Sequence, residues 1–169
     1  FSERKVHVGG LQEARPLSTG IFQAADHIIV TSAADKAGGH GMMVAISTSL
    51  SWGTVQDEKH RITIHDVELL EATCRTLIVG IKTQFVDLVV IALHGPRSTS
   101  NDDTPAEFWP RVHMTAMKFA ASRPRLYLMD SNCTAAEEME PVPAKIRVDA
   151  HLLEAWRRSA TDPDDQIYL

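Results

Sequence analysis

Leu126-Tyr-Leu-Met-Asp130-Ser-Asn132 is an apolar run that ends in a carboxylate and a carboxamide. The pattern predicts a buried β-strand over residues 125–129. Side chains two residues apart on an extended segment point the same way, so Asp130 and Asn132 are expected to share one mouth at the strand end. There a carboxylate can orient or deprotonate water, and a carboxamide can donate to a phosphoryl oxygen. An Asx-type turn that closes the strand is the alternative interpretation.

An acidic strand end is expected near the N-terminus, in Val6-His-Val-Gly-Gly-Leu11-Gln-Glu13. A carboxylate directly after a buried strand can hold Mg²⁺, which prefers one or two hard oxygen ligands together with water and substrate phosphate. Gln12 is expected to fix the Glu13 carboxylate by a hydrogen bond. A solvated carboxylate at a strand end is the simpler alternative.

A third strand is expected to end in histidine, in Leu88-Val-Val-Ile-Ala-Leu93-His94-Gly-Pro96. Gly95-Pro96 forces a turn, which favours a position for His94 at a loop mouth over one in the core. An imidazole there can donate to a phosphate oxygen or act as a general acid. A packed, hydrogen-bonded histidine is the alternative.

The composition is that of a soluble globular protein with enough residues for one domain, 169 in all. No apolar run reaches the roughly 18 residues that would indicate a membrane span, and no signal peptide is visible, so an intracellular location is expected, the nucleus included. Cys74 and Cys133 are expected to be free thiols. The net charge of −5 does not favour non-specific binding to nucleic acid. A local basic rim can still guide an anionic substrate, and the candidates for it are Arg15, Arg97, Arg111, Arg123 and Arg125. The alternative is that these arginines are scattered and solvated.

The order of apolar runs predicts several antiparallel strands followed by helix, strand and helix. Strands are expected over residues 6–11, 21–33, 42–50, 61–71, 74–82, 85–94 and 125–129, and helices over 104–121 and 149–159. The strand over 61–71 contains one phase slip that indicates a bulge. The first half offers no helix as a crossover, so we expect an α/β (α+β) fold of mixed, mainly antiparallel sheets with helices packed outside.

Two local patterns add detail to this expectation. Thr104-Pro105-Ala-Glu107 is a typical helix start, and the side chains expected on the inner face of that helix are Phe108, Val112, Met117 and Ala120. Gly38-Gly-His-Gly41 lacks the Lys-Ser/Thr of a phosphate-binding loop and predicts a hairpin turn, with an unusual backbone conformation at His40.

Four stretches in this order resemble motifs of the endonuclease/exonuclease/phosphatase superfamily, which includes deoxyribonuclease I and the endonuclease domains of non-LTR retrotransposons. Leu11-Gln12-Glu13 resembles the metal-binding strand of the family, and Gly38-Gly-His-Gly-Met-Met-Val-Ala-Ile-Ser47 resembles its Gly-rich hairpin. Ile91-Ala-Leu-His94-Gly-Pro96 is similar to the central strand that bears a catalytic His or Tyr. Pro124-Arg-Leu-Tyr-Leu-Met-Asp130-Ser-Asn132-Cys-Thr-Ala135 is similar to its Gly-Asp-Phe-Asn-Ala block.

The resemblance implies a four-layer α/β sandwich, with residues 1–169 as a single domain that lacks the first strand and the C-terminal Ser-Asp-His block of the family. It therefore also implies that this segment alone is weakly active and prone to aggregate. Two departures stand in the strongest motif, where Met129 replaces the family's Gly and Ser131 its Phe.

By resemblance, the chain is a divalent-metal-dependent phosphodiester hydrolase, with a retroelement-type DNA endonuclease as the first hypothesis. Glu13 would bind Mg²⁺ or Mn²⁺, Asp130 would activate water, and Asn132 and His94 would contact the phosphate. A phosphatase of the same fold acting on a lipid, nucleotide or inositol phosphate is one alternative. A decayed, non-enzymatic copy is the other. The sequence sets no oligomeric state, and it predicts no membrane partner.

Overall fold

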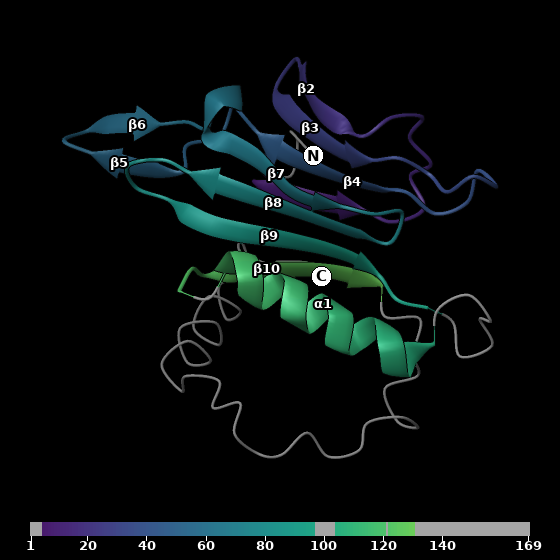
Figure 1. The fold of residues 1–169 in the computed structure, drawn as a ribbon. Coiled ribbons are helices and arrows are strands. Elements are labelled where there is room, and N and C mark those ends of the chain that lie inside the picture. The colour runs from purple at the N-terminus through teal and green to yellow at the C-terminus, as the bar shows by residue number, and fades with distance from the viewer. Residues whose placement is uncertain (1–4, 97–103, 121, 131–169) are drawn as a thin grey trace, which may run out of the picture. The chain divides into compact units, whose positions relative to one another are not determined.

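The central strand of the fold is Asp87–His94 (β9), in which every residue from Val89 to His94 is buried. The computed structural model of the chain describes residues 5–96, 104–120 and 122–130, which belong to one compact unit (Figure 1). An apolar run of this kind forms a strand that is covered on both faces. A second sheet covers one face of this strand, and a helix covers the other.

One cover is a four-stranded antiparallel sheet in the order β1-β4-β3-β2. Its strands are Val8–Leu11 (β1), Gly20–Ala24 (β2), His27–Ser32 (β3) and Met42–Ser47 (β4). Residues 33–41 join β3 to β4, and this connection contains the glycine-rich loop predicted over residues 35–41. We call this sheet the N-terminal sheet.

The central sheet contains β9 and has the order β10-β9-β8-β7. Its other strands are Val67–Ala72 (β7), Thr76–Lys82 (β8) and Arg125–Asp130 (β10). β7, β8 and β9 are antiparallel, whereas β10 is parallel to β9 and is reached through the helix Pro105–Ala120 (α1). A short hairpin, Gly53–Val55 (β5) with Glu58–His60 (β6), and the 3-10 helix Ile64–Asp66 (η2) complete the described elements.

Two apolar cores lie on opposite faces of the central sheet, because β9 sends alternate side chains to each. Val90 and Ala92 pack with residues of the N-terminal sheet. Val89, Ile91 and Leu93 pack with Phe108, Val112 and Ala116 of α1. Figure 1 shows the same layers, with α1 lying along β9 and β10. The described residues therefore form a mixed α/β fold, dominated by its sheets.

Several local predictions are confirmed. The β3–β4 hairpin is antiparallel, and the phase slip in the 61–71 pattern corresponds to a register shift between Leu69 and Glu71. α1 begins at Pro105, and the backbone N–H groups of Glu107 and Phe108 both donate to the Thr104 carbonyl. His40 has a φ of 58°, in the left-handed region.

Two predicted strand ranges are wrong. The range 21–33 holds two strands rather than one, because a two-residue turn at Ala25-Asp26 lets Ala24 pair with His27. The range 61–71 is strand only from Val67, because Asp66 accepts hydrogen bonds from the backbone and hydroxyl of Thr63 and stabilises a turn. The hairpin β5–β6 was not predicted.

Two predictions of burial are also wrong. β10 forms as expected, but Leu126, Tyr127 and Met129 are 36%, 43% and 57% exposed, because β9 is its only strand partner among the described residues. Met117 is 37% exposed, since the inner face of α1 runs through Phe108, Val112 and Ala116 instead. The predicted helix over 149–159 and the residues Asn132 and Cys133 lie outside the described residues, as does the side chain of Ala120.

No helix in the described part of the chain is both long enough and apolar enough to cross a membrane.

Candidate metal centre

The segments around Glu13 and His40 are joined by the antiparallel pairing of β1 and β4. Leu11 at the end of β1 pairs with Met43 near the start of β4, so the residues after Leu11 run beside those before Met42. Two backbone hydrogen bonds continue this contact beyond the sheet, from Ala14 N–H to the Gly41 carbonyl at 3.0 Å and from Arg15 N–H to the His40 carbonyl at 3.1 Å. They fix the two segments to each other.

Both segments carry non-glycine residues in the left-handed region of the backbone. Glu13, Arg15 and His40 have φ values of 53°, 51° and 58°. Such conformations cost free energy in non-glycine residues and persist where the surrounding structure enforces them. Here the hydrogen-bonded backbone enforces them. Two of these residues, Glu13 and His40, carry side chains of the cluster described below.

His94 ends β9 on the central sheet, and its N–H donates to the Arg75 carbonyl at 2.9 Å. A backbone hydrogen bond from Gly41 to the Cys74 carbonyl at 2.8 Å ties the N-terminal sheet to this end of the central sheet. His94 Nε2 lies 3.6 Å from Glu13 Oε1, and the His94 side chain is only 3% exposed. The predicted loop-mouth position is therefore wrong, because this end of β9 is covered.

Asp130 ends β10 and pairs in parallel register with His94. Its carbonyl accepts a hydrogen bond from Gly95 N–H at 2.8 Å, and the residue is exposed. Gln12 donates to the Leu128 carbonyl at 3.2 Å, so the amide that was expected to fix Glu13 instead joins β1 to β10. The ends of β1, β9 and β10 thus meet at one edge, with Glu13, His94 and Asp130 there.

Glu13, His40 and His94 form a cluster with the composition and spacing of metal ligands. One ligand atom from each lies within 4.8 Å of the others, and the two imidazole rings are 5.2 Å apart between centroids. Glu13 is exposed, His40 is half-buried and His94 is buried, so the cluster opens to solvent on the carboxylate side. This arrangement can hold a metal ion.

A guanidinium group lies against the cluster. Arg75 NH2 is 3.0 Å from His40 Nε2, and Arg75 NH1 donates to the Gly95 carbonyl at 3.3 Å. Burial, followed by the charge of Arg75, lowers the pKa of His94, and the Glu13 carboxylate opposes this shift. His94 is therefore neutral at pH 7, with one ring nitrogen free to accept a proton or a metal ion.

The loop that carries His40 is held by Asp35. The Asp35 carboxylate accepts hydrogen bonds from the N–H groups of Ala37 at 2.9 Å and Gly39 at 2.8 Å. The bond from Gly39 is the main cause of the lowered pKa of Asp35. Asp35 Oδ2 also lies 3.7 Å from His40 Nε2, so this carboxylate both shapes the loop and faces the imidazole.

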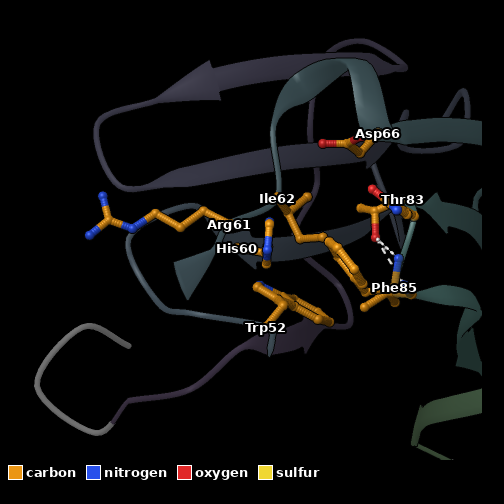
Figure 2. A pocket seen from close by; sticks show the side chains of 9 residues that line it. Trp52, His60, Arg61, Ile62, Asp66, Thr83 and Phe85 are labelled. Atoms are coloured by element: carbon orange, nitrogen blue, oxygen red, sulfur yellow. Dashed lines mark hydrogen bonds between the residues drawn. The ribbon is translucent and has the colours of Figure 1, made fainter. Parts of the chain in front are cut away.

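A separate pocket of about 220 Å³ lies at the other end of the β8–β9 hairpin, where residues 83–86 form the turn. Figure 2 shows Trp52, His60 and Phe85 grouped together while Arg61 points away from them. The His60 and Phe85 rings are 4.2 Å apart between centroids. None of the predicted site residues lines this pocket, so the strand-end cluster is the stronger candidate for chemistry.

Two members of the centre were not predicted as functional. His40 was assigned to a hairpin turn, and only the pairing of β1 with β4 reveals that it faces Glu13. Arg75 precedes β8 and carries no motif at all. No known protein-family model matches the chain, and no curated protein is significantly similar to it. The indication of its chemistry therefore comes from the side chains at the ends of β1, β9 and β10.

Proposed function

We propose that the centre hydrolyses phosphodiesters with the help of a divalent ion, with DNA as the first candidate substrate. The proposal rests above all on one observation, the 3.6 Å separation between His94 Nε2 and Glu13 Oε1, which come from different sheets. Asp130 ends β10 beside His94 of β9, so a second carboxylate is available at the same edge. The resemblance of four sequence stretches to the endonuclease/exonuclease/phosphatase superfamily points to the same chemistry.

Each side chain has a distinct role in this proposal. Glu13 would hold Mg²⁺ or Mn²⁺, which when bound neutralises charge on the scissile phosphate. Asp130 accepts a proton from water as the water oxygen bonds to phosphorus. The bond from phosphorus to the leaving oxygen breaks, and solvent protonates that oxygen. Neutral His94 donates its ring N–H to a phosphate oxygen. The amide of Asn132 is proposed to donate to the phosphate as well.

The same proposal covers the architecture. The described residues form three layers, the N-terminal sheet, the central sheet and α1. We propose that they belong to a four-layer α/β sandwich in which the outer face of the N-terminal sheet is also covered. A retroelement origin and a nuclear location belong to the same proposal.

The test is single-turnover cleavage of supercoiled plasmid by excess protein in Mn²⁺ or Mg²⁺. Asp130→Ala should lower the rate by roughly 10²-fold or more, because it removes the group that accepts the proton of water. Glu68→Ala removes an exposed carboxylate from β7 at the opposite edge of the central sheet and should leave the rate unchanged. A loss smaller than about threefold for Asp130→Ala would remove this residue from the mechanism.

The choice of substrate is tested in the same preparation. Plasmid DNA, an inositol phosphate, a nucleotide and a phosphorylated lipid in vesicles are compared at equal concentration. Faster turnover of a phosphomonoester than of plasmid would favour the phosphatase alternative. Because residues 1–169 alone are expected to be weakly active, the assay is run at single turnover with excess protein. Absence of even weak cleavage of every substrate by the folded protein would favour the decayed copy and contradict the proposed function.

A further inference from the structure

The three ligand candidates of the centre are not those of a typical magnesium site. Two of them are imidazoles, and Mg²⁺ takes carboxylate, carbonyl and water oxygens instead. Imidazole nitrogen favours later first-row ions, and Zn²⁺ is held by His and carboxylate ligands with a fourth position open in catalytic sites. We propose that Glu13, His40 and His94 form a site that prefers a transition ion of the Zn²⁺ class over Mg²⁺, with His40 as the residue that sets this preference.

The spacing of the ligand atoms fits a tetrahedral ion. Ligands about 2.1 Å from such an ion are about 3.4 Å from each other. His94 Nε2 and Glu13 Oε1 are 3.6 Å apart, too far for a hydrogen bond and close to this separation. All three ligand atoms lie within 4.8 Å of one another. Shifts of about 1 Å in the side chains would bring them to the separation of a tetrahedral site. Glu13 is 44% exposed and can make such a rotation.

Both imidazoles also have a ring nitrogen that needs a partner. Nδ1 of His40 and Nδ1 of His94 are buried and have no hydrogen-bond partner among the described residues. A buried ring nitrogen without a partner calls for an explanation such as a bound water. An ion bound to Nε2 of His94 leaves Nδ1 of that ring protonated, as a metal-bound imidazole requires. The His94 ring is also held in place by its burial, which lowers the cost of fixing a ligand.

The charges around the cluster favour a cation despite Arg75. The carboxylates of Glu13, Asp35 and Asp130 act on the two imidazoles, against one guanidinium. Arg75 donates to His40 Nε2 and so competes with an ion for that nitrogen. The ion must therefore be one that binds imidazole tightly, because a weakly bound ion gains too little from a single carboxylate to displace the guanidinium. This condition favours Zn²⁺ over Mg²⁺.

The inference rests on the proposed function and names the class of ion for the same centre, but it assigns His94 Nε2 to the ion instead of to a phosphate oxygen. It is measured by binding alone. The chain is stripped with EDTA, dialysed and titrated calorimetrically with ZnCl₂ and with MgCl₂. We expect one Zn²⁺ per chain, bound at least tenfold more tightly than Mg²⁺. The absorption spectrum of bound Co²⁺ gives a second measure, because tetrahedral coordination raises its visible absorption strongly.

The decisive variant is His40→Asn, since asparagine tolerates the left-handed backbone at this position. It should weaken Zn²⁺ binding at least tenfold and change Mg²⁺ binding less than twofold. His113→Asn, on the exposed face of α1, is the matched control and should bind Zn²⁺ as the wild type does. Equal Zn²⁺ affinity in His40→Asn and wild type, or equal affinity of the wild type for Zn²⁺ and Mg²⁺, would overturn the inference.

Failure of the inference is distinguishable from failure of the proposed function. Zn²⁺ binding that depends on His40, without cleavage of any phosphate ester, would uphold the ion preference and reject the hydrolase. The opposite result is cleavage in Mg²⁺ that is unchanged in His40→Asn, together with Zn²⁺ binding no tighter than Mg²⁺ binding. It would uphold the hydrolase and reject the ion preference.

Discussion

At the residue scale, Gly41 holds the loop of His40 in place. Its φ is +78°, and a Cβ at this position would lie 2.7 Å from Pro16 Cδ and 3.2 Å from Ala34 N. Gly41→Ala combines a backbone penalty with a steric clash and should lower the free energy of unfolding by about 2–4 kcal/mol. Urea denaturation in EDTA measures this change without any contribution from metal.

Gly38 in the same loop is the matched control. Its φ is +77°, but no described atom would lie within 4 Å of an added Cβ. Gly38→Ala should therefore cost only the backbone term, about 1 kcal/mol. Equal losses in the two alanine variants would show that the clash with Pro16 and Ala34 does not matter, and would contradict the tight packing of this loop.

At the residue scale the sequence predicts the identity of some site members but not their contacts. Glu13 and His94 stand out because each follows an apolar run, and this pattern is visible without a structure. His40 could be predicted to have an unusual backbone, yet its proximity to Glu13 depends on the register of β1 against β4. Arg75 has no local pattern, because it reaches His40 only through the packing of the two sheets.

At the element scale, α1 contains a proline in its interior. Pro110 lies in the sixth position of the helix, so it cannot donate the backbone hydrogen bond that other residues there make. The residue is exposed, and no core contact depends on its ring. Pro110→Ala should raise the free energy of unfolding by about 1–3 kcal/mol.

The measurement is urea denaturation of Pro110→Ala beside His113→Ala, an exposed position of the same helix. The second variant should differ from the wild type by less than about 0.5 kcal/mol. A loss of stability in Pro110→Ala would mean that the ring contributes packing that outweighs the missing hydrogen bond, and would contradict this description of α1.

Elements were predictable where one local signal dominates. The long apolar runs of β8 and β9 and the Thr104 cap of α1 are of this kind. The exposure of β10 was not predictable, because an apolar run cannot tell whether a neighbouring strand covers it. The turn at Ala25-Asp26 was missed for a similar reason, since apolar residues continue on both sides of it.

At the scale of the whole molecule, the centre depends on the packing of two sheets that meet at one edge. Glu13 follows β1 and His40 precedes β4 in the N-terminal sheet, whereas His94 and Asp130 end β9 and β10 of the central sheet. No single segment contains the ligands, which is why a short sequence motif describes this site poorly. The mixed α/β class follows from the order of the runs, but the way the two sheets bring these ends together does not.

The most direct measurement is the Mn²⁺ dependence of plasmid cleavage by the wild type, by Glu13→Gln and by Glu58→Gln, an exposed control in β6. We predict that EDTA abolishes cleavage and that Glu13→Gln lowers the rate at least tenfold at limiting Mn²⁺, because the carboxylate that holds the ion is lost. Glu58→Gln should match the wild type. Cleavage that persists in EDTA, or a Glu13→Gln variant as active as the wild type, would contradict a metal-dependent centre at Glu13 and His94.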